Sequence, residues 1–363
     1  MAENLKPKTD VQKVMELLSD KNNLLIAQVA PSVRVSIGEE FGYPAGCFHE
    51  GKTVAALKQL GFFKVFDITV GADLTVMEES DELVALMKRK RKRTLFTSCC
   101  PSWINYVKIK FPKFVPMLST CLSPTRMLGA VIKNYYAKSL DLTNKKLYVI
   151  SVMPCVAKKQ EILKGDEVDI AITTREFAEL IKLNNINYND LADVPFDNPL
   201  GEYSGAGIIF GATGGVTQAV LRTAAYKLNG NRNCEVNIYA TRKARGVKDV
   251  KVVAGNVELN VCIISGLINA ERVLTNIALG KKHYDFVEVM SCVGGCVNGG
   301  GQPFIDKTVH SANRIIKKRA KALFDKDRKL KVKNSYENEI LQKIYKDFIL
   351  KNSKNKHLLH NKK

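Results

Sequence analysis

The sequence lacks the features that mark several special classes of protein. Its 363 residues contain no run of about 18 apolar residues, since apolar stretches such as 261–268 are interrupted by Ser and Gly. This absence excludes a transmembrane helix. Residues 1–21 mix acidic and basic side chains without an apolar core, which excludes a signal peptide. With 45% apolar and 25% charged residues, disordered, collagen-like and coiled-coil chains are excluded too. We expect a soluble cytoplasmic protein, with an organellar matrix as the open alternative.

Acidic residues are scarce relative to basic ones. The sequence has 56 Lys and Arg and only 36 Asp and Glu, which gives a net charge of +20. The excess of basic residues is concentrated in residues 314–363 and in the basic run 88–93. Such runs are most often solvated surface, here a helix end and a frayed tail, but they also suit nucleic acid, an anionic membrane or an acidic protein. The sequence has no zinc-finger spacing and no RNA-binding signature, which disfavours nucleic acid.

Short strand-like runs alternate with helical periodicity, a pattern typical of α/β folds. We expect two lobes with mostly parallel sheets flanked by helices, spanning 1–190 and 191–350, and a basic tail over 351–363. The predicted strands are 24–29, 63–69, 94–98, 146–152, 168–173, 234–241, 248–253, 257–264 and 284–290. The turn residues Gly255 and Asn256 predict that 248–253 and 257–264 form a hairpin. The predicted helices are 31–41, 73–88, 102–110, 124–138, 174–182, 214–228, 270–278, 311–325 and 335–350.

Three segments place cysteine directly after a predicted strand. They are residues 97–103 (TSCCPSW), 153–161 (MPCVAKKQE) and 288–303 (EVMSCVGGCVNGGGQP). Because functional groups of α/β folds gather where strands end, these segments are candidates for one site, buried between the lobes. In a reducing compartment, clustered cysteines are metal ligands or reactive thiols more often than disulfides.

The cysteine spacing favours an iron–sulfur cluster. Cys292 and Cys296 are four residues apart, so on a helical turn their thiolates would face one side. Cys100 and Cys155 complete the four thiolates of a 4Fe-4S cubane. A four-cysteine zinc site remains the competing interpretation, although it usually has paired C-x-x-C knuckles. For each cysteine alone, a buried free thiol is the plain alternative.

A nucleotide site is not supported by the glycine-rich segments. Residues 294–301 lack the Lys-Ser/Thr of a P-loop, and Phe210 stands where a dinucleotide fingerprint needs glycine.

The three segments resemble the three signatures of iron-only (FeFe) hydrogenases, TSCCPxW, MPCxxKxxE and ExMxCxxGCxxGGGQP. The similarity extends to residues 27–42, 71–79 and 201–215. The resemblance implies an H-cluster, in which Cys100, Cys155, Cys292 and Cys296 hold a cubane. It also implies that Cys296 bridges to a two-iron subsite with CO, cyanide and azadithiolate, where protons and electrons interconvert with H2.

The resemblance also implies roles for the residues around the two-iron subsite. Lys158 would pair with a cyanide ligand, helped by donors near Ala30, Pro31 and Ser32, and Met153, Met290 and Phe210 would form an apolar wall. A buried ammonium beside an anionic ligand is physically sensible, whereas a surface lysine is the alternative for Lys158.

A proton relay is the second requirement. Cys99 adjoins Cys100, and neighbours in an extended segment point to opposite sides, so Cys99 can escape ligation and donate protons. Glu79 and Glu82 are three residues apart on one helix face. The resemblance places Glu79, Ser119 and Glu82 on a relay from Cys99 to the surface, and an ordinary acidic helix face is the alternative.

Some positions depart from the family pattern. Leu122 replaces a usual lysine, Thr125 a usual pocket glutamine, and Leu86 an arginine common at the outer end of the relay. Because Thr125 is shorter, it would leave room for a water near the two-iron subsite. The scattered residues Cys47, Cys121, Cys234 and Cys262 are expected to be core thiols.

The partners follow from the resemblance and the charge. No ferredoxin-like cysteine run precedes the three signatures, so we expect electrons to reach the cubane from a separate ferredoxin or similar acidic carrier, attracted by the basic excess. We also expect maturation proteins for the two-iron subsite, H2 and protons as substrates, no membrane, and a monomer. A hydrogen or redox sensor and an iron–sulfur assembly protein of the same superfamily are the alternatives.

Overall fold

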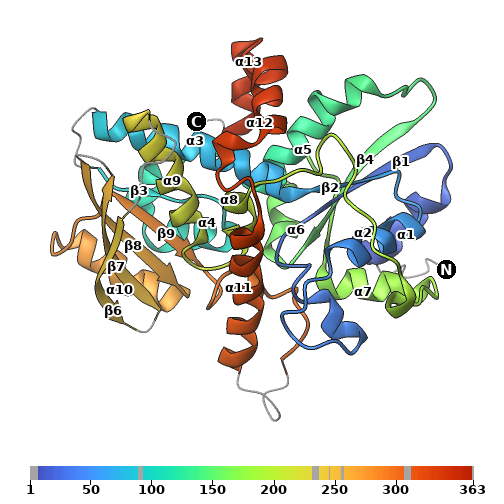
Figure 1. The fold of residues 1–363 in the computed structure, drawn as a ribbon, viewed down its shortest axis with the longest axis horizontal. Helices are drawn as coiled ribbons and strands as arrows, with labels where there is room; N and C mark the ends of the chain where they lie inside the picture. Colours follow the sequence, from blue (N-terminus) through green and yellow to red (C-terminus); the bar gives the residue numbers. More distant parts are fainter. Residues whose placement is uncertain are drawn as a thin grey trace, which may run out of the picture.

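Two β-sheets form the framework of the molecule. The computed structural model describes residues 7–88, 93–230, 237–244, 246–254, 257–305 and 312–361. Sheet A has the order β2-β1-β4-β5 and is parallel throughout, with β2 Lys64–Asp67, β1 Asn23–Val29, β4 Lys146–Met153 and β5 Ile170–Thr173. Figure 1 shows the two sheets on opposite sides of the molecule, with α11 and α12 between them.

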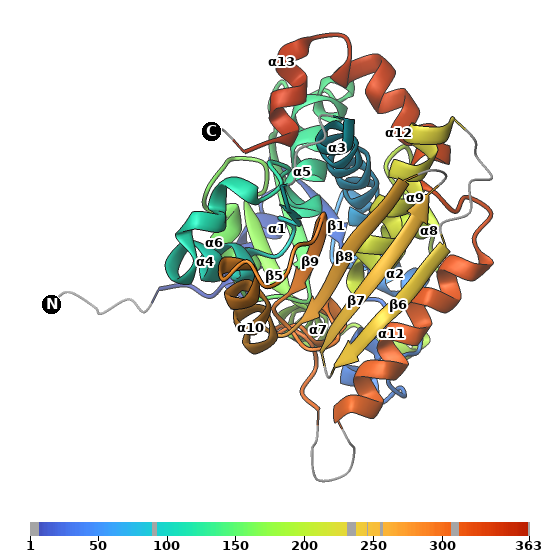
Figure 2. The same ribbon diagram turned by 90° about the vertical axis from the view of Figure 1, so that its left-hand side faces the viewer.

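Sheet B is mixed. Its order is β3-β9-β8-β7-β6, formed by β3 Leu95–Phe96, β9 Phe286–Met290, β8 Val257–Ser265, β7 Val247–Ala254 and β6 Asn237–Ala244. The β3-β9 and β9-β8 pairs are parallel, and the β8-β7 and β7-β6 pairs are antiparallel. Figure 2 shows this sheet facing the viewer. The α/β class with two sheets and flanking helices is therefore confirmed.

Helices cover the sheets as the alternating sequence pattern predicts. Around sheet A lie α1 Asp10–Ser19, α2 Glu50–Gln59, α5 Pro124–Asn134, α6 Ala157–Ile162 and α7 Thr174–Leu183. Sheet B has α9 Gly215–Asn229 on one face and α4 Pro101–Lys110 with α10 Leu267–Ala278 on the other. Alternate strand residues supply the two faces: Val261 and Phe286 face the α9 side, whereas Cys262 and Val287 face α4 and α10. This is the two-residue side-chain period of a strand buried on both sides.

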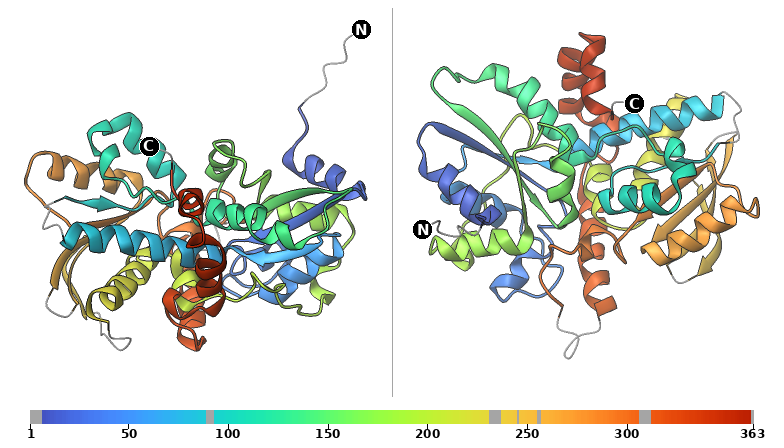
Figure 3. Two further views of the ribbon diagram at one scale, coloured as in Figure 1. Left: turned by 90° about the horizontal axis from the view of Figure 1, so that it is seen from above. Right: turned by 180° about the vertical axis from the view of Figure 1, so that it is seen from behind.

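Helix α3, Ile68–Lys88, belongs to both hydrophobic cores. Its residues Ile68, Val70 and Leu74 pack in the core of sheet A, and Val76 and Leu83 pack in the core of sheet B. The two views of Figure 3 show this helix running from one lobe toward the other. The helix is therefore buried nearly all round, which explains its weak amphipathic pattern.

The C-terminal part of the chain is folded. It comprises α11 Ala312–Lys329, η7 Ser335–Glu337, α12 Glu339–Ile344, a π-helical turn η8 Tyr345–Ile349, α13 Ser353–Lys356 and η9 His357–Leu359. Leu359 is fully buried in the core of sheet A, and its carbonyl accepts from the Leu122 N–H at 2.8 Å. The expectation of a frayed basic tail is thus wrong for residues 353–361. Of the basic run 88–93, residues 89–92 lie outside the described residues.

Several predicted boundaries shift. The helix predicted over 31–41 is wrong in its first half, where turns precede the 3₁₀ helix η1 Ile37–Phe41. These turn residues are buried on all sides, including Arg34, whose guanidinium donates to Glu50 at 2.7 Å, so no helix face is left for solvent. Helix α3 begins at Ile68 instead of residue 73, and α1, α2 and α6 are additional. The antiparallel β7-β8 pair confirms the predicted hairpin.

The chain crosses between the sheets before residue 190. Strand β3 and helix α4, within residues 95–110, belong to the sheet B lobe although they precede β4 and β5 of sheet A. The division at residue 190 stays a prediction. The remaining elements are short: α8 Gly205–Ile208, η2 Pro112–Met117, η3 Tyr136–Ser139, η4 Tyr188–Asp190, η5 Ile209–Gly211 and η6 Cys296–Asn298. Among the described residues, none of the helices combines the length and apolarity needed to cross a membrane.

A buried carboxylate ties α3 to two distant segments. Asp73 accepts hydrogen bonds from the Ser335 hydroxyl at 2.7 Å, the Asn338 amide at 2.9 Å and both the hydroxyl and N–H of Ser204. Burial raises the pKa of Asp73, and these donors oppose the rise. Since Ser204 precedes α8 and the other two residues flank η7, one side chain joins three parts of the chain.

We predict that Asp73→Ala lowers the free energy of unfolding by about 3 kcal/mol, because it leaves buried donors without an acceptor. Asp325→Ala is the matched control, since Asp325 forms ion pairs with the exposed Lys321 and Arg328. Exposed pairs of this kind contribute about 0–1 kcal/mol. Anaerobic thermal unfolding of both variants checks this, and equal stabilities would contradict it.

Candidate active site between the two sheets

The three cysteine-bearing segments meet at one cavity between the sheets. Each follows a strand, namely β3, β4 and β9, and the turn after β1 forms a further wall. Carboxyl ends of strands from both sheets therefore face one another, as expected for α/β folds. The cavity is lined by all seven residues predicted to surround the two-iron subsite, Ala30, Pro31, Ser32, Met153, Lys158, Phe210 and Met290, and by Cys99, Cys100 and Cys296.

Four thiols converge beside this cavity. Cys100 caps α4, Cys155 precedes α6, and Cys292 and Cys296 lie in the loop after β9. Burial raises the pKa of Cys292 to about 11, and the Cys100 and Cys155 thiols add to the rise. Burial and then Cys155, Cys100 and Cys292 likewise raise the pKa of Cys296. Thiols that disfavour one another's ionisation fit a site where a cationic iron cluster binds them as thiolates.

The loop between Cys292 and Cys296 is a glycine turn and not the helical turn that the spacing suggested. Gly294 has a φ of 90° and Gly295 a φ of 97°, in the left-handed region that favours glycine. A Cβ on Gly295 would lie 2.7 Å from the Thr213 nitrogen. The glycines therefore let the loop press against the neighbouring backbone and turn both cysteines toward the other two.

Lys158 is a buried ammonium and not a surface lysine, since it is only 5% exposed. Its Nζ lies 2.6 Å from Oε2 of Glu161 and 3.3 Å from the carbonyl oxygen of Cys99. Burial alone would lower the pKa of Lys158, but the Glu161 carboxylate raises it overall. The same Glu161 oxygen accepts from the Ser123 hydroxyl at 2.9 Å. Lys158 can therefore present a fixed positive charge to an anionic ligand in the cavity. The sequence reasoning did not assign Glu161 this role, although its three-residue spacing from Lys158 was a signal.

The predicted relay residues lie near one another. Cys99 is half-buried with one side on the cavity, and burial and then the Glu79 carboxylate raise its pKa well above the ordinary value. Cys99 packs on the α9 side of sheet B and Cys100 on the opposite side, as expected for neighbours in an extended segment. Burial and then Glu82 raise the pKa of Glu79 to about 8, while the Ser98 N–H and the nearby Ser119 hydroxyl oppose this.

Glu79 and Glu82 each keep one oxygen available. Oε2 of Glu79 and Oε2 of Glu82 are buried and have no hydrogen-bond partner among the described residues. The other Glu82 oxygen accepts from the Thr120 N–H at 3.0 Å, and Ser119 Oγ accepts from the Cys121 N–H at 3.2 Å. Ser119 and Glu82 thus both lie near Glu79.

The departures from the family pattern have structural consequences. Thr125 lines the cavity, and its hydroxyl lies 3.6 Å from the Met153 sulfur. Leu122 is buried against the C-terminal segment, and Leu86 packs against the sheet B core. Cys121 and Cys262 are buried core thiols as predicted, whereas Cys47 is only half-buried, and Cys234 lies outside the described residues.

The sequence matches two families along its length. Residues 23–300 match the family described as iron only hydrogenase large subunit, C-terminal domain, and residues 313–362 match the iron hydrogenase small subunit. The chain is 39% identical to iron hydrogenase 1 of Clostridium pasteurianum over 95% of its length, and it spans 61% of that relative.

Solved structures of the same kind superpose over nearly the whole chain. A structure of the [FeFe]-hydrogenase HydA1 of Chlamydomonas reinhardtii has a TM-score of 0.83 and 31% identity, and 98% of each chain is covered. The protein NAR1 of Arabidopsis thaliana is 28% identical over 93% of this chain. Other relatives are named as cytosolic iron–sulfur cluster assembly factors.

We predict that anaerobic reconstitution with iron and sulfide loads about four irons per chain, as a cubane requires. Cys292→Ala should lose most of this iron because one of four thiolates is missing. Cys47→Ala is the matched control, since its thiol lies apart from the cavity and should leave the iron content unchanged. Equal iron contents in the two variants would refute the assignment.

Proposed function

Because this chain belongs to the iron-only hydrogenase family, we propose that it catalyses the reversible reduction of protons to H2. The observation that carries the proposal is the cavity itself, where Cys296, Cys99 and Lys158 line one space between the two sheets. A cluster ligand, a titratable thiol and a buried cation are the groups that such chemistry requires. In the family they serve an H-cluster, and we propose the same cofactor here.

The protein would hold this cofactor mainly through its cubane. Cys100, Cys155, Cys292 and Cys296 would supply the thiolates, and Cys296, which lines the cavity together with Cys100, would also bind the two-iron subsite. When bound, this cofactor with its CO, cyanide and azadithiolate ligands would supply electrons and the metal atoms at which protons and H2 interconvert. Lys158 would hold an anionic ligand, and Met153, Met290 and Phe210 would exclude water from the cavity.

The chain's own residues would move the protons. Cys99 retains its thiol proton because burial and Glu79 raise its pKa, so it can donate toward the cavity. With its pKa near 8, Glu79 also carries a proton at neutral pH and can replace the one that Cys99 gives up. Ser119 and Glu82 extend the path outward, away from the metal site.

An iron–sulfur assembly role is the second candidate, favoured by the similarity to NAR1 over most of the chain. A cluster carrier needs the four cysteines but no proton path to a cavity. The adjoining Cys99 and Glu79, with raised pKa values, favour the hydrogenase over the carrier and over a sensor.

We predict that Cys99→Ser and Glu79→Gln each lower H2 turnover by about 100-fold or more, the usual contribution of a positioned acid or base. Iron content should stay at the wild-type level, because neither residue is placed among the cluster ligands. Dye-linked H2 evolution by the matured protein checks this. Full activity in either variant would contradict the proposed relay. An inactive wild-type protein would favour the assembly role.

We further propose that an acidic carrier such as ferredoxin docks where the cubane lies nearest the surface. Val156 and Val293 are about half exposed beside Cys155 and Cys292. The N-terminal part of α11 lies against the same loop, since a Cβ on Gly294 would meet the Ile316 side chain at 2.2 Å. That part of α11 exposes four basic residues, Arg314, Lys317, Lys318 and Lys321. The family also suggests maturation proteins that deliver the two-iron subsite.

We predict that ferredoxin-linked turnover falls about tenfold between low and high ionic strength, because salt screens exposed charges. Turnover with a cationic dye should barely change. Lys317→Glu should weaken the ferredoxin reaction, whereas Lys145→Glu, an exposed lysine next to β4, should not. If turnover with both electron donors responds to salt in the same way, the basic residues are an ordinary solvated surface and not a docking site.

A further inference from the structure

We propose that His360 is the outer proton-exchanging residue of the relay, reached from Glu82 through the Thr120 hydroxyl. This inference rests on the proposed function, since it concerns how protons leave the same relay. It assigns a role to the C-terminal segment that sequence analysis had expected to be a tail. In this role His360 would replace the arginine that is common at the outer end of the relay in the family. In this chain Leu86 stands at that position and packs against apolar residues.

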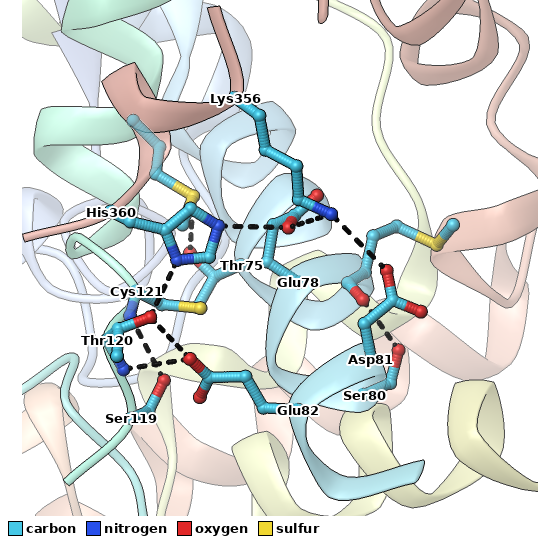
Figure 4. Close-up of polar contacts among 12 residues, drawn as sticks. Thr75, Glu78, Ser80, Asp81, Glu82, Ser119, Thr120, Cys121, Lys356 and His360 are labelled. Carbon is cyan, nitrogen blue, oxygen red and sulfur yellow. Dashed lines mark hydrogen bonds and ion pairs between the residues drawn. The ribbon is translucent and has the colours of Figure 1, made fainter. Parts of the chain in front are cut away.

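The backbone holds His360 next to the relay. Cys121 and His360 form an isolated antiparallel bridge, and the Asn361 N–H donates to the Thr120 carbonyl at 2.7 Å. The Leu122 N–H donates to the Leu359 carbonyl in the same stretch. The short segment after Ser119 is therefore paired with residues 359–361, and Figure 4 shows the His360 ring beside Thr120.

The side chains form an unbroken line of hydrogen bonds. The Thr120 hydroxyl lies 2.5 Å from Oε1 of Glu82 and 2.8 Å from Nδ1 of His360. On the far side of the ring, Nε2 of His360 lies 3.0 Å from Oε2 of Glu78. The line therefore runs from Glu82 through one hydroxyl to an imidazole whose side chain is 18% exposed.

A proton can cross this line with no other change in the molecule. When Glu82 is protonated, its proton passes to the Thr120 oxygen while the hydroxyl proton of Thr120 passes to Nδ1. Glu82 becomes a carboxylate, Thr120 keeps one proton, and the ring carries N–H groups on both nitrogens. Imidazole suits this task because one nitrogen can take up a proton while the other gives one up.

Charged and titratable groups face the His360 ring from several elements. Burial would raise the pKa of Glu78, but His360, the Tyr345 hydroxyl and Lys356 lower it to about 2, so Glu78 is a carboxylate. Lys356 Nζ lies 3.1 Å from Glu78 and 4.0 Å from Asp81, and it is 48% exposed. Glu82 and the Cys121 thiol face the ring from the relay side, and burial and then Glu82 keep the pKa of that thiol high.

A competing exit exists in the structure. Ser119 and Thr120 also line a surface cleft together with Arg126 and Glu161, so water there could take protons directly from Ser119. In that case His360 would only clamp the C-terminal segment to α3. The two possibilities differ in whether the histidine ring itself carries the proton.

The first measurement does not depend on hydrogen turnover. In the matured protein labelled with ¹⁵N-histidine, we would follow the His360 ring by NMR across pH, using Thr120→Val and the conservative Thr120→Ser. We expect Thr120→Val to shift the ring's titration midpoint by about half a pH unit or more, and Thr120→Ser to leave it in place. Equal midpoints in wild type and Thr120→Val would overturn the coupling.

The second measurement is dye-linked turnover from pH 6 to 9. We expect His360→Ala and His360→Gln to lower the turnover rate about tenfold. Imidazole added to the solution should restore at least half of the rate lost in His360→Ala. Both variants should also slow more in D2O than the wild-type protein does. His357→Gln, an exposed histidine three residues away, is the matched control and should match wild type. Rescue by imidazole separates proton transfer from clamping, because it cannot restore a lost backbone contact.

Two results would contradict the inference. Wild-type rates in His360→Ala at every pH would mean that protons leave through the cleft, and a loss that imidazole does not relieve would mean that His360 is structural. A wild-type protein without H2 turnover would contradict the proposed function alone, and the NMR measurement would still decide the coupling.

Discussion

The structure depends on a single helix being buried from both sides. Helix α3 contributes to the cores of sheet A and sheet B, so the two sheets cannot move apart without exposing apolar residues of α3. Asp73 strengthens this constraint by binding Ser204, Ser335 and Asn338 inside the protein. The carboxyl ends of β1, β3, β4 and β9 are thereby held around one cavity. Because Glu79 and Glu82 lie on the same helix, the scaffold and the proposed relay share one rigid element.

The cavity combines charges and thiols that would be costly to bury alone. Lys158 is offset by Glu161, which Ser123 also binds, so the ammonium is paired before any ligand arrives. Burial and the neighbouring cysteines raise the pKa of Cys292 and Cys296, a cost that a bound cationic cluster would offset. Glu79 resolves its own burial by keeping a proton, which is also what a relay carboxyl needs. The cost of burying a charge therefore explains why Lys158 is paired with Glu161 and why Glu79 keeps its proton.

Local sequence signals predicted the parts of the fold that depend on neighbouring residues. Most strands and helices, the β7-β8 hairpin, and the gathering of the three cysteine segments at strand ends follow from periodicity and motif position. Over residues 31–36 the predicted helix was wrong because Arg34 is buried by an ion pair with Glu50. Sequence periodicity does not reveal such a long-range pair. The glycine turn after Cys292 was misjudged as helical because a spacing of four residues fits both a glycine turn and a helical turn.

His360 was missed because Thr120 and Glu78 lie 240 and 282 residues away in sequence. A basic, polar composition concealed the buried Leu359 beside it.

The proposed function depends on what the cavity beside Cys296 binds. The most direct measurement is the infrared spectrum of the protein after anaerobic maturation in a host that makes the two-iron subsite. A hydrogenase would show bands of metal-bound CO and cyanide, retained in Cys99→Ser and lost in Cys296→Ala, because we propose Cys296 as the ligand that joins the subsite to the protein. A cubane-loaded protein without such bands, whatever its iron content, would contradict the proposed function and leave an iron–sulfur carrier.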